Sequence, residues 1–185
     1  IAANIEFPMP SRFFWQTQRS VLPDLAQESV YQKDNLRWLI FECLQDDALM
    51  ARPEFTLLQH YMAQGQDTQK LALRQYRLAI TIADLYDQYL VYRPDWIKNW
   101  EEQSFEIDES PLGDQKWQGI LWYELRQLIK AKELPLAHRA NMLDDFLSHV
   151  HQGKDKLPKQ VIFFGFTTLP KHQLDSLSVL TQHMD

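Results

Sequence analysis

The sequence is poor in several residue types, and each shortage excludes a class of protein. Its 185 residues contain one cysteine, Cys43, which excludes an internal disulfide framework and a cysteine-based zinc site. Its 5 glycines are scattered and form neither GxxxxGK[ST] nor GxGxxG, the loops whose backbone N–H groups cradle nucleotide phosphates. The motifs HExxH, ExxH and GxSxG are also missing. No apolar run approaches the roughly 20 residues needed to cross a bilayer.

Positive charge is also in short supply. The 19 lysines and arginines stand against 25 aspartates and glutamates, a formal net charge of −6. Non-specific DNA binding depends on neutralising phosphates with cations, so we expect little of it, although a local base-reading site stays possible. The 45% hydrophobic content predicts a globular chain of one domain or slightly more. The lone thiol suits a reducing cytoplasm. Because the sequence opens on IAANIEFPMP without a methionine, we interpret it as a piece of a longer protein.

Helical periodicity dominates the sequence. The expected helices cover about 12–22, 29–49, 54–63, 69–92, 96–102, a stretch from 114, a stretch from 135, and 170–183. The expected caps are Ser11, Asp67 or Thr68, and Asp114. Residues expected to form buried stripes are Leu36, Leu39, Ile40 and Cys43; Leu73, Tyr76, Ile80, Ala83 and Leu90; Trp117, Leu121, Leu125 and Leu128; and Met142, Phe146 and Val150.

Two short segments predict strands at about 4–7 and 161–166, the second being the buried-looking run VIFFGF. Some 150 residues of helix separate them, which favours a mainly α chain built as a helical insertion within part of an α/β domain. We therefore expect 1–10 and 160–185 to belong to the α/β core and 11–159 to form a mostly helical subdomain. The acidic stretch EEQSFEIDESPLGD is expected to be a mobile loop.

The densest polar cluster is ADLYDQYLVYRPDW. Asp84, Asp87 and Gln88 share one helical face at i, i+3 and i+4, and Arg93 stands at the helix end. Two carboxylates could act as general acid and base, hold a divalent metal, or accept hydrogen bonds from base edges. A solvated helical face with aromatic residues packed beneath explains the same pattern.

Two further positions are candidates for DNA contact. Trp15 ends the segment PMPSRFFW, just after a proline-rich turn, where it could stack on a base or anchor a helix to the core. Arg139 in AHRANM could grip a guanine edge bidentately or be a surface charge. By contrast, Cys43 lies on an apolar face and is expected to be structural, and His149 and His151 are spaced too closely to share a helical face.

Four segments together resemble the RecC family, the gamma subunits of exodeoxyribonuclease V: IAANIEFPMPSRFFW, IADLYDQYLVYRPDWIKNWE, HRANML and VIFFGFTTLP. The resemblance implies a region similar to a superfamily-1 helicase that has lost its ATPase motifs. In a working helicase the VIFFGF strand would carry an acidic, magnesium-holding motif. Here no acid follows it, because Gly165 to Thr168 reads GFTT.

The resemblance also implies a function. It implies a non-catalytic, DNA-scanning subunit of the bacterial RecBCD helicase–nuclease, which repairs double-strand breaks by homologous recombination in the cytoplasm. RecB, RecD and single-stranded DNA would be its partners, with no membrane, and ATP and magnesium would be used by the partner subunits. The residues that would read the Chi sequence are Met9, Trp15, Asp84, Leu85, Asp87, Gln88, Arg93 and Arg139. Met9 stands where the best-known relatives have leucine, a volume-conserving change.

Two alternatives remain open at this point. The polar clusters could bind the RecB partner instead of DNA, which would make the chain a helical scaffold. Asp84 and Asp87 could instead hold a metal for nuclease chemistry, although no third ligand recurs at suitable spacing.

Overall fold

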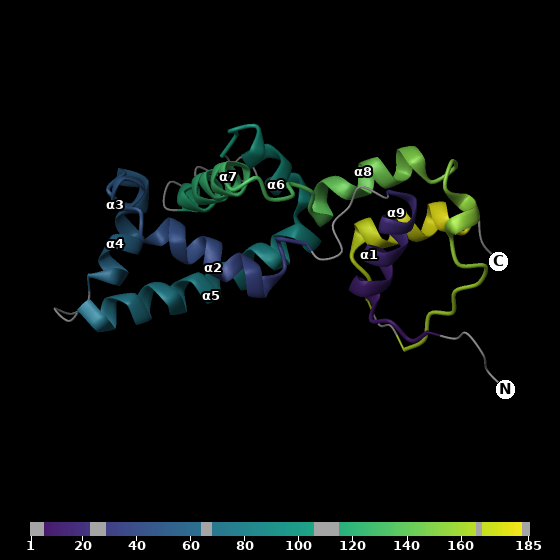
Figure 1. The fold of residues 1–185 in the computed structure, drawn as a ribbon, viewed down its shortest axis with the longest axis horizontal. Helices are drawn as coiled ribbons and strands as arrows, with labels where there is room; N and C mark the ends of the chain where they lie inside the picture. Colours follow the sequence, from purple (N-terminus) through teal and green to yellow (C-terminus); the bar gives the residue numbers. More distant parts are fainter. Residues whose placement is uncertain (1–5, 23–28, 64–67, 106–114, 166–167, 183–185) are drawn as a thin grey trace. The chain divides into compact units, whose positions relative to one another are not determined.

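The computed structural model of the chain describes residues 6–22, 29–63, 68–105, 115–165 and 168–182. These residues are mainly helical, as expected, and no strand forms among them. The elements, in chain order, are α1 (Pro10–Val21), α2 (Lys33–Leu44), α3 (Asp47–Met50), the 3-10 turn η1 (Pro53–Phe55), α4 (Thr56–Met62), α5 (Thr68–Tyr92), α6 (Pro94–Glu101), α7 (Lys116–Ala131), α8 (Arg139–His149), the 3-10 turn η3 (Lys154–Lys156) and α9 (Lys171–Leu180) (Figure 1).

The chain divides into two compact units. Unit 2 spans 27–140, and unit 1 combines 1–26 with 141–185. Helix α8 therefore begins in unit 2 with Arg139 and Ala140, and its remaining residues belong to unit 1. The expected division into an α/β core and a helical subdomain stays a prediction.

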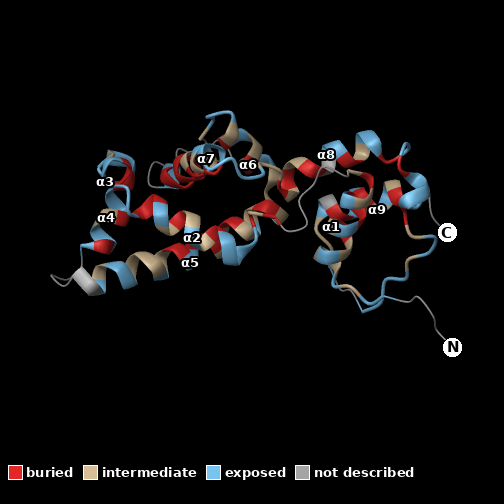
Figure 2. Cartoon of the chain, viewed as in Figure 1, coloured by how far each residue is buried: buried red, intermediate tan, exposed pale blue. Residues whose placement is uncertain are grey.

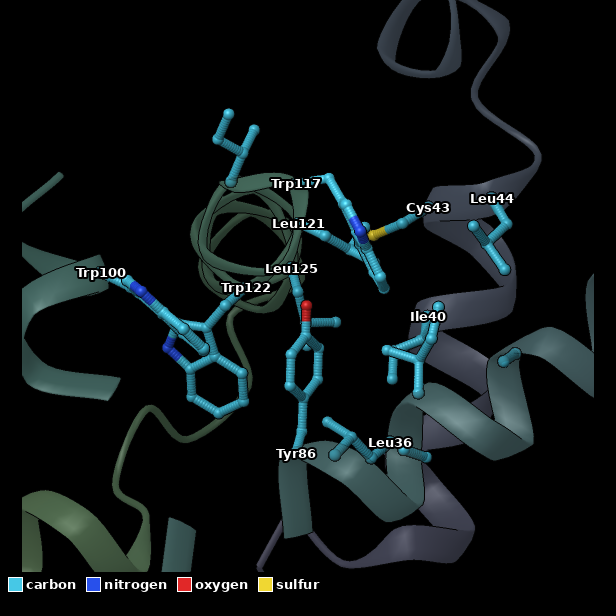
Figure 3. Close-up of a cluster of buried hydrophobic side chains, with 14 of the residues drawn as sticks. Leu36, Ile40, Cys43, Leu44, Tyr86, Trp100, Trp117, Leu121, Trp122 and Leu125 are labelled. Atoms are coloured by element: carbon cyan, nitrogen blue, oxygen red, sulfur yellow. The ribbon is translucent and has the colours of Figure 1, made fainter. Parts of the chain in front are cut away.

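Among the described helices of unit 2, α2, α5, α6 and α7 carry most of its core. Helices α2 and α5 pack side by side, α6 packs on α7, and α7 also contacts α2 (Figure 1). Buried residues recur along one side of α2, as its periodicity predicts (Figure 2). Tyr86 of α5 stands in the middle of this core, between the α2 residues Leu36 and Ile40 and the aromatic residues of α6 and α7 (Figure 3). Its hydroxyl donates to the Gln118 backbone carbonyl at 2.7 Å, so the buried hydroxyl keeps a hydrogen-bond partner.

Most of the expected stripes are confirmed. Leu36, Ile40 and Cys43 are buried in α2, with Leu39 packed at the edge of the core, and the α7 and α8 stripes are buried or packed against a core. In α5, Ala83 and Leu90 are buried as expected. The predicted Leu73 and Ile80 are exposed instead, while Ala79, Ile82 and Tyr86 are buried.

Some helix ends differ from the expected positions because a capping side chain or a proline starts or stops the helix there. The 29–49 helix is interrupted because the Asp46 side chain accepts hydrogen bonds from the Ala48 and Leu49 backbone N–H groups and starts a new helix, α3. Helix α1 begins at Pro10 after Met9, since proline lacks the N–H that the first turn leaves unsatisfied. Pro94 ends α5 and opens α6 for the same reason. The helix expected from 135 begins at Arg139.

The predicted buried strand at 161–166 is wrong over the residues described. Residues 161–165 are not in a strand, and Ile162 and Phe164 are 80% and 92% exposed. In the first segment, Glu6 and Phe7 are likewise not in a strand. A strand exists only where a neighbouring backbone supplies hydrogen bonds, and the described residues provide no such partner to either segment. Residues 4, 5 and 166, the caps Asp67 and Asp114, and 106–114 of the acidic stretch lie outside the described residues.

Unit 1 has a small core of its own. Val21, Phe146, Val150, Leu157 and Leu180 are buried together in it. Phe13 of α1 packs edge to face on Phe163, with ring centroids 5.7 Å apart.

Candidate functional site

Two carboxylates and a lysine from separate helices form the centre of the site. Asp84 and Asp87 lie one turn apart on α5, the arrangement that their i, i+3 spacing predicts. Lys33, the first residue of α2, places its Nζ 2.9 Å from Asp84 Oδ1 and 3.8 Å from Asp87 Oδ2. The hydrogen bond to Asp84 raises the pKa of Lys33 above its ordinary value, so this lysine is a cation at neutral pH. It bridges the two carboxylates at the position where a metal-based mechanism would need an ion.

Arg139 adds the second cation. It is the first residue of α8, and its Nη1 donates to Asp87 Oδ1 at 3.1 Å. The four charges alternate in sign along the series Asp84, Lys33, Asp87 and Arg139, and their sum is zero. We call these four residues the charged cluster. Asp87 is the best shielded acid, with 22% of its side chain exposed against 51% for Asp84.

The other predicted α5 residues lie around this cluster. Leu85 is partly buried, and Gln88 is exposed one turn after Asp84. Arg93, just past the end of α5, pairs with Asp95 through Nη2 and Oδ2 at 3.0 Å, and its guanidinium lies 3.7 Å from the centre of the Trp96 ring. This stacking and pairing fix Arg93 at the junction of α5 and α6.

Met9 and Trp15 belong to unit 1. Met9 is the residue before α1 and is 73% exposed, and Trp15 is partly buried within α1. Asp84, Asp87 and Arg139 are brought together within unit 2. The proximity of Met9 and Trp15 to them stays a prediction.

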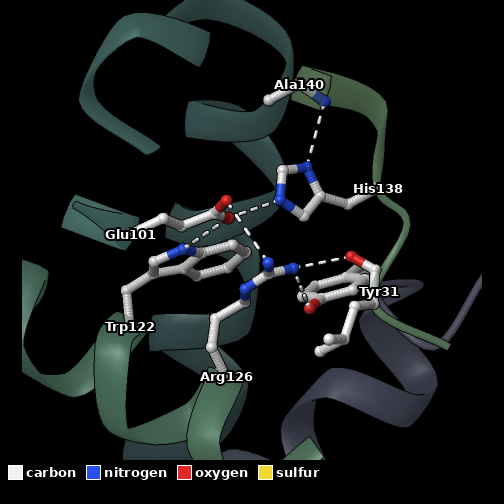
Figure 4. A network of polar contacts seen from close by, with 7 residues as sticks. Tyr31, Glu101, Trp122, Arg126, His138 and Ala140 are labelled. Atoms are coloured by element: carbon white, nitrogen blue, oxygen red, sulfur yellow. Dashed lines mark hydrogen bonds and ion pairs between the residues drawn. The ribbon is translucent and has the colours of Figure 1, made fainter. Parts of the chain in front are cut away.

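A buried polar network supports the start of α8 (Figure 4). His138 is fully buried, and its Nε2 lies 2.5 Å from Glu101 Oε1. The same carboxylate oxygen accepts from Trp122 Nε1 at 3.3 Å, and Arg126 Nη2 lies 3.4 Å from Glu101 Oε2. Arg126 also donates to the Tyr31 hydroxyl and to the Leu136 carbonyl. This network joins α6, α7, the turn before α2 and the segment leading into α8.

The protonation states of His138 and Glu101 follow from burial and from the hydrogen-bond donors around them. Burial lowers the pKa of His138 and outweighs the neighbouring Glu101, which would raise it. Burial alone would raise the pKa of Glu101, but the hydrogen bond from His138 and the Arg126 charge bring it below the ordinary value. The Ala140 backbone N–H donates to His138 Nδ1 at 3.2 Å, so Nδ1 carries the lone pair and Nε2 the proton. The pair is a neutral imidazole on an ionised carboxylate.

Sequence reasoning missed Lys33, Glu101 and His138. Lys33 lies 51 and 54 positions from its two partners, and no periodic signal joins residues so far apart. His138 did carry a signal, since it opens the HRANML segment and directly precedes Arg139. Cys43 is buried as expected, and burial raises its pKa to about 12, so its thiol is not activated as a nucleophile.

Comparison with known proteins places the chain in a family. The family model for the RecC N-terminal domain matches residues 1–185. The chain is 36% identical over 188 residues to the RecBCD enzyme subunit RecC of Escherichia coli K12, covering all of this chain and 16% of that protein. It is 32% identical over 203 residues to the RecC subunit of Haemophilus influenzae, covering all of this chain and 18% of that protein.

The RecC subunit of Mycolicibacterium smegmatis matches at 25% identity over 190 residues. The chain therefore belongs to the RecC N-terminal domain family, and it spans about a sixth of the length of these relatives. Within the described residues, no helix combines the length and apolarity that a membrane crossing needs.

Proposed function

We propose that this chain is part of a non-catalytic, DNA-scanning subunit of a RecBCD-type helicase–nuclease, and that the charged cluster reads base edges of a single strand. Its partners would be subunits of the RecB and RecD type, in the bacterial cytoplasm, during double-strand break repair by homologous recombination. The described helices would form an insertion within a helicase-like α/β domain. ATP and magnesium would be bound by the partner subunits.

The observation that carries this proposal is the composition of the cluster. Arg139 has paired donors suited to the O6 and N7 acceptors of guanine, and Asp84 and Asp87 have acceptors suited to the cytosine amino group. The cluster has no net charge, and the chain carries −6, so a phosphate backbone gains little from this surface. Recognition at such a site has to come from base edges.

The energies favour exchange of internal pairs for base contacts. The pairs of the cluster are partly exposed, and pairs of this kind are worth about 0–1 kcal/mol each. A good bidentate contact to the correct base contributes about 1–3 kcal/mol of discrimination. A matching base can therefore replace the pair between Arg139 and Asp87, whereas a mismatched base leaves that pair the better option.

Lys33 supports a non-catalytic role. A nuclease metal held by Asp84 and Asp87 would compete with an ammonium group 2.9 Å from one carboxylate and 3.8 Å from the other. An arrangement neutralised by lysine and arginine needs no metal to balance its charge.

A scaffold role is the second candidate, and exposed aromatic side chains favour it. Trp38 of α2 is more than half exposed, and its ring lies 5.0 Å from that of Tyr76 on α5. Tryptophan is among the side chains enriched in protein contacts. Leu73 of α5 is also exposed. This face could dock a RecB-type partner.

Substitutions in the assembled enzyme separate the two candidates. Asp87→Asn and Arg139→Gln are expected to abolish the change in nuclease activity at the Chi sequence while assembly and unwinding stay normal. Asp34→Asn, an exposed acid on α2, is the matched control and should respond as the parent enzyme does. Failure of the complex to assemble with either cluster variant would favour the scaffold role.

A further inference from the structure

We propose that His138, oriented by Glu101, is a positioning residue that fixes the first turn of α8 and so presents Arg139 to Asp87. The inference rests on the proposed base-reading function, which it deepens by naming the residue that sets the cluster's geometry. It concerns a contact between α6 and the start of α8, both within unit 2.

The His138 ring links two elements. At one end Nδ1 accepts a hydrogen bond from the Ala140 N–H, one of the backbone donors that the start of a helix leaves without a partner. At the other end Nε2 meets Glu101 at the last residue of α6. The ring is held edge to face against Tyr31 and Trp122, with centroids 5.0 and 5.7 Å away. His138 thus acts as the N-cap of α8, a role that serine, threonine, aspartate or asparagine usually has, and its ring is held in place by Glu101.

Glu101 is placed where helix stability alone would not put an acid. It ends α6, and the negative end of the helix dipole disfavours a carboxylate there. Three donors, from His138, Trp122 and Arg126, compensate for that position and for its partial burial. Apolar residues often stabilise a protein as well as a buried ion network does, so a network of this kind points to a requirement for fixed geometry.

The geometry it fixes includes Arg139. This residue directly follows His138, so the hydrogen bond to Ala140 holds the backbone on both sides of it. A helix start without its cap frays, and the guanidinium of Arg139 would then lose its fixed approach to Asp87 Oδ1. In this arrangement Glu101 and His138 act on DNA only through Arg139.

Two substitutions distinguish positioning from filling of space. His138→Leu keeps a bulky apolar side chain but offers no acceptor, and His138→Asn is smaller but retains one near the position of Nδ1. The readout is the coupling between Asp87→Asn and Arg139→Gln, measured by a double-mutant cycle on unfolding of the full chain at low ionic strength. We expect the coupling to be lost with His138→Leu and retained with His138→Asn. The order would be reversed if His138 only filled space, and that order overturns the proposal.

The tautomer gives a second measurement that does not depend on variants. The NMR chemical shifts of the two imidazole nitrogens of His138 should show a proton on Nε2 and a lone pair on Nδ1 at neutral pH. A proton on Nδ1 would exclude the cap and overturn the proposal. His149, at the exposed end of the same helix, is the reference histidine in the same measurement.

The DNA response of the assembled enzyme keeps this inference separate from the proposed function. Loss of coupling with His138→Leu together with loss of the Chi response supports both the positioning role of His138 and the proposed base reading. Loss of coupling with an unchanged Chi response upholds positioning and contradicts base reading by Arg139. Retained coupling with His138→Leu overturns positioning, whatever the DNA response.

Discussion

Arg139 and Asp87, 52 positions apart in the sequence, meet at 3.1 Å and join the first residue of α8 to the C-terminal part of α5. Lys33 bridges the same aspartate to Asp84, so one carboxylate is shared by two cations from different helices. This shared acid makes Asp87 the residue on which the cluster depends.

The charges of the Arg139–Asp87 pair can be exchanged by substitution. Arg139→Asp brings a third carboxylate beside Asp84 and Asp87, and we expect it to destabilise the chain by about 1 kcal/mol. Combining it with Asp87→Arg restores an opposite-charge pair and most of the stability, as thermal unfolding will measure. The exchanged pair should not restore the Chi response, because base edges require donors and acceptors at fixed places. Restoration of both would indicate that the pair is structural only.

Lys33 is expected to influence recognition more than stability. Its side chain is 52% exposed, so Lys33→Met should change the free energy of unfolding by less than about 0.5 kcal/mol. The substitution leaves Asp84 without its bridging cation, and the sequence preference of the assembled enzyme should shift accordingly. Lys130→Met, at an exposed position of α7, is the control. A large loss of stability would contradict this view of Lys33.

Stability should depend on pH through His138. Burial lowers its folded-state pKa below the ordinary value of 6.5, so in the interval between the two values the unfolded chain binds a proton that the folded chain does not. The contribution of His138 is therefore complete above pH 6.5 and is lost as the pH falls below it. Glu101, whose pKa lies below 4.5, adds a similar loss only under more acidic conditions.

Thermal unfolding between pH 7.5 and 5.5, compared between variants of a buried and an exposed histidine, will measure the effect of His138. The melting temperature should fall over this range, and the fall should be smaller with His138→Asn than with the exposed control His60→Asn. Equal slopes for the two variants would contradict a buried neutral imidazole.

Gly119 sets how closely α7 approaches α6. A Cβ at this position would lie 2.7 Å from Cδ1 and 2.8 Å from Nε1 of Trp100, which is fully buried. Alanine improves helix propensity by up to about 1 kcal/mol, but overpacking of a rigid core costs about 1–3 kcal/mol. We expect Gly119→Ala to lower the free energy of unfolding by about 1–2 kcal/mol, measured with denaturant. Gln127→Ala on the exposed side of α7 should be neutral, and a stabilised Gly119→Ala would refute the tight contact.

Periodicity predicted the helical core well where one apolar stripe faces one partner. Trp117, Leu121 and Leu125 are buried as their spacing indicates. Helix α5 carries apolar residues on more than one face, and packing against α2 decides which face is covered. This packing buries Ala79 and Ile82 and leaves Leu73 exposed. Periodicity alone does not predict which face of α5 is covered.

The strand prediction failed for a different reason. The β-branched and aromatic composition of 161–166 describes a segment suited to pairing, but pairing requires a second strand. Within the described part of the chain none is present, and Phe164 stands exposed. Local composition predicts a propensity, and tertiary partners decide whether it is used.

The site was predictable in part. The spacing of Asp84 and Asp87 places both acids on one face, and the HRANML segment marked Arg139. The bridge formed by Lys33 is a product of long-range packing, which no local pattern in the sequence encodes. The cap formed by His138 is local, but its ring is oriented by Glu101, which lies 37 positions away in the sequence.

The most direct test of the central claim is the Chi response of the assembled enzyme carrying both Asp87→Asn and Arg139→Gln. DNA containing the recognised sequence and DNA with the same bases scrambled are compared for unwinding and for cleavage. Our account predicts normal unwinding with identical cleavage of the two DNAs. A cleavage difference as large as that of the parent enzyme would contradict it.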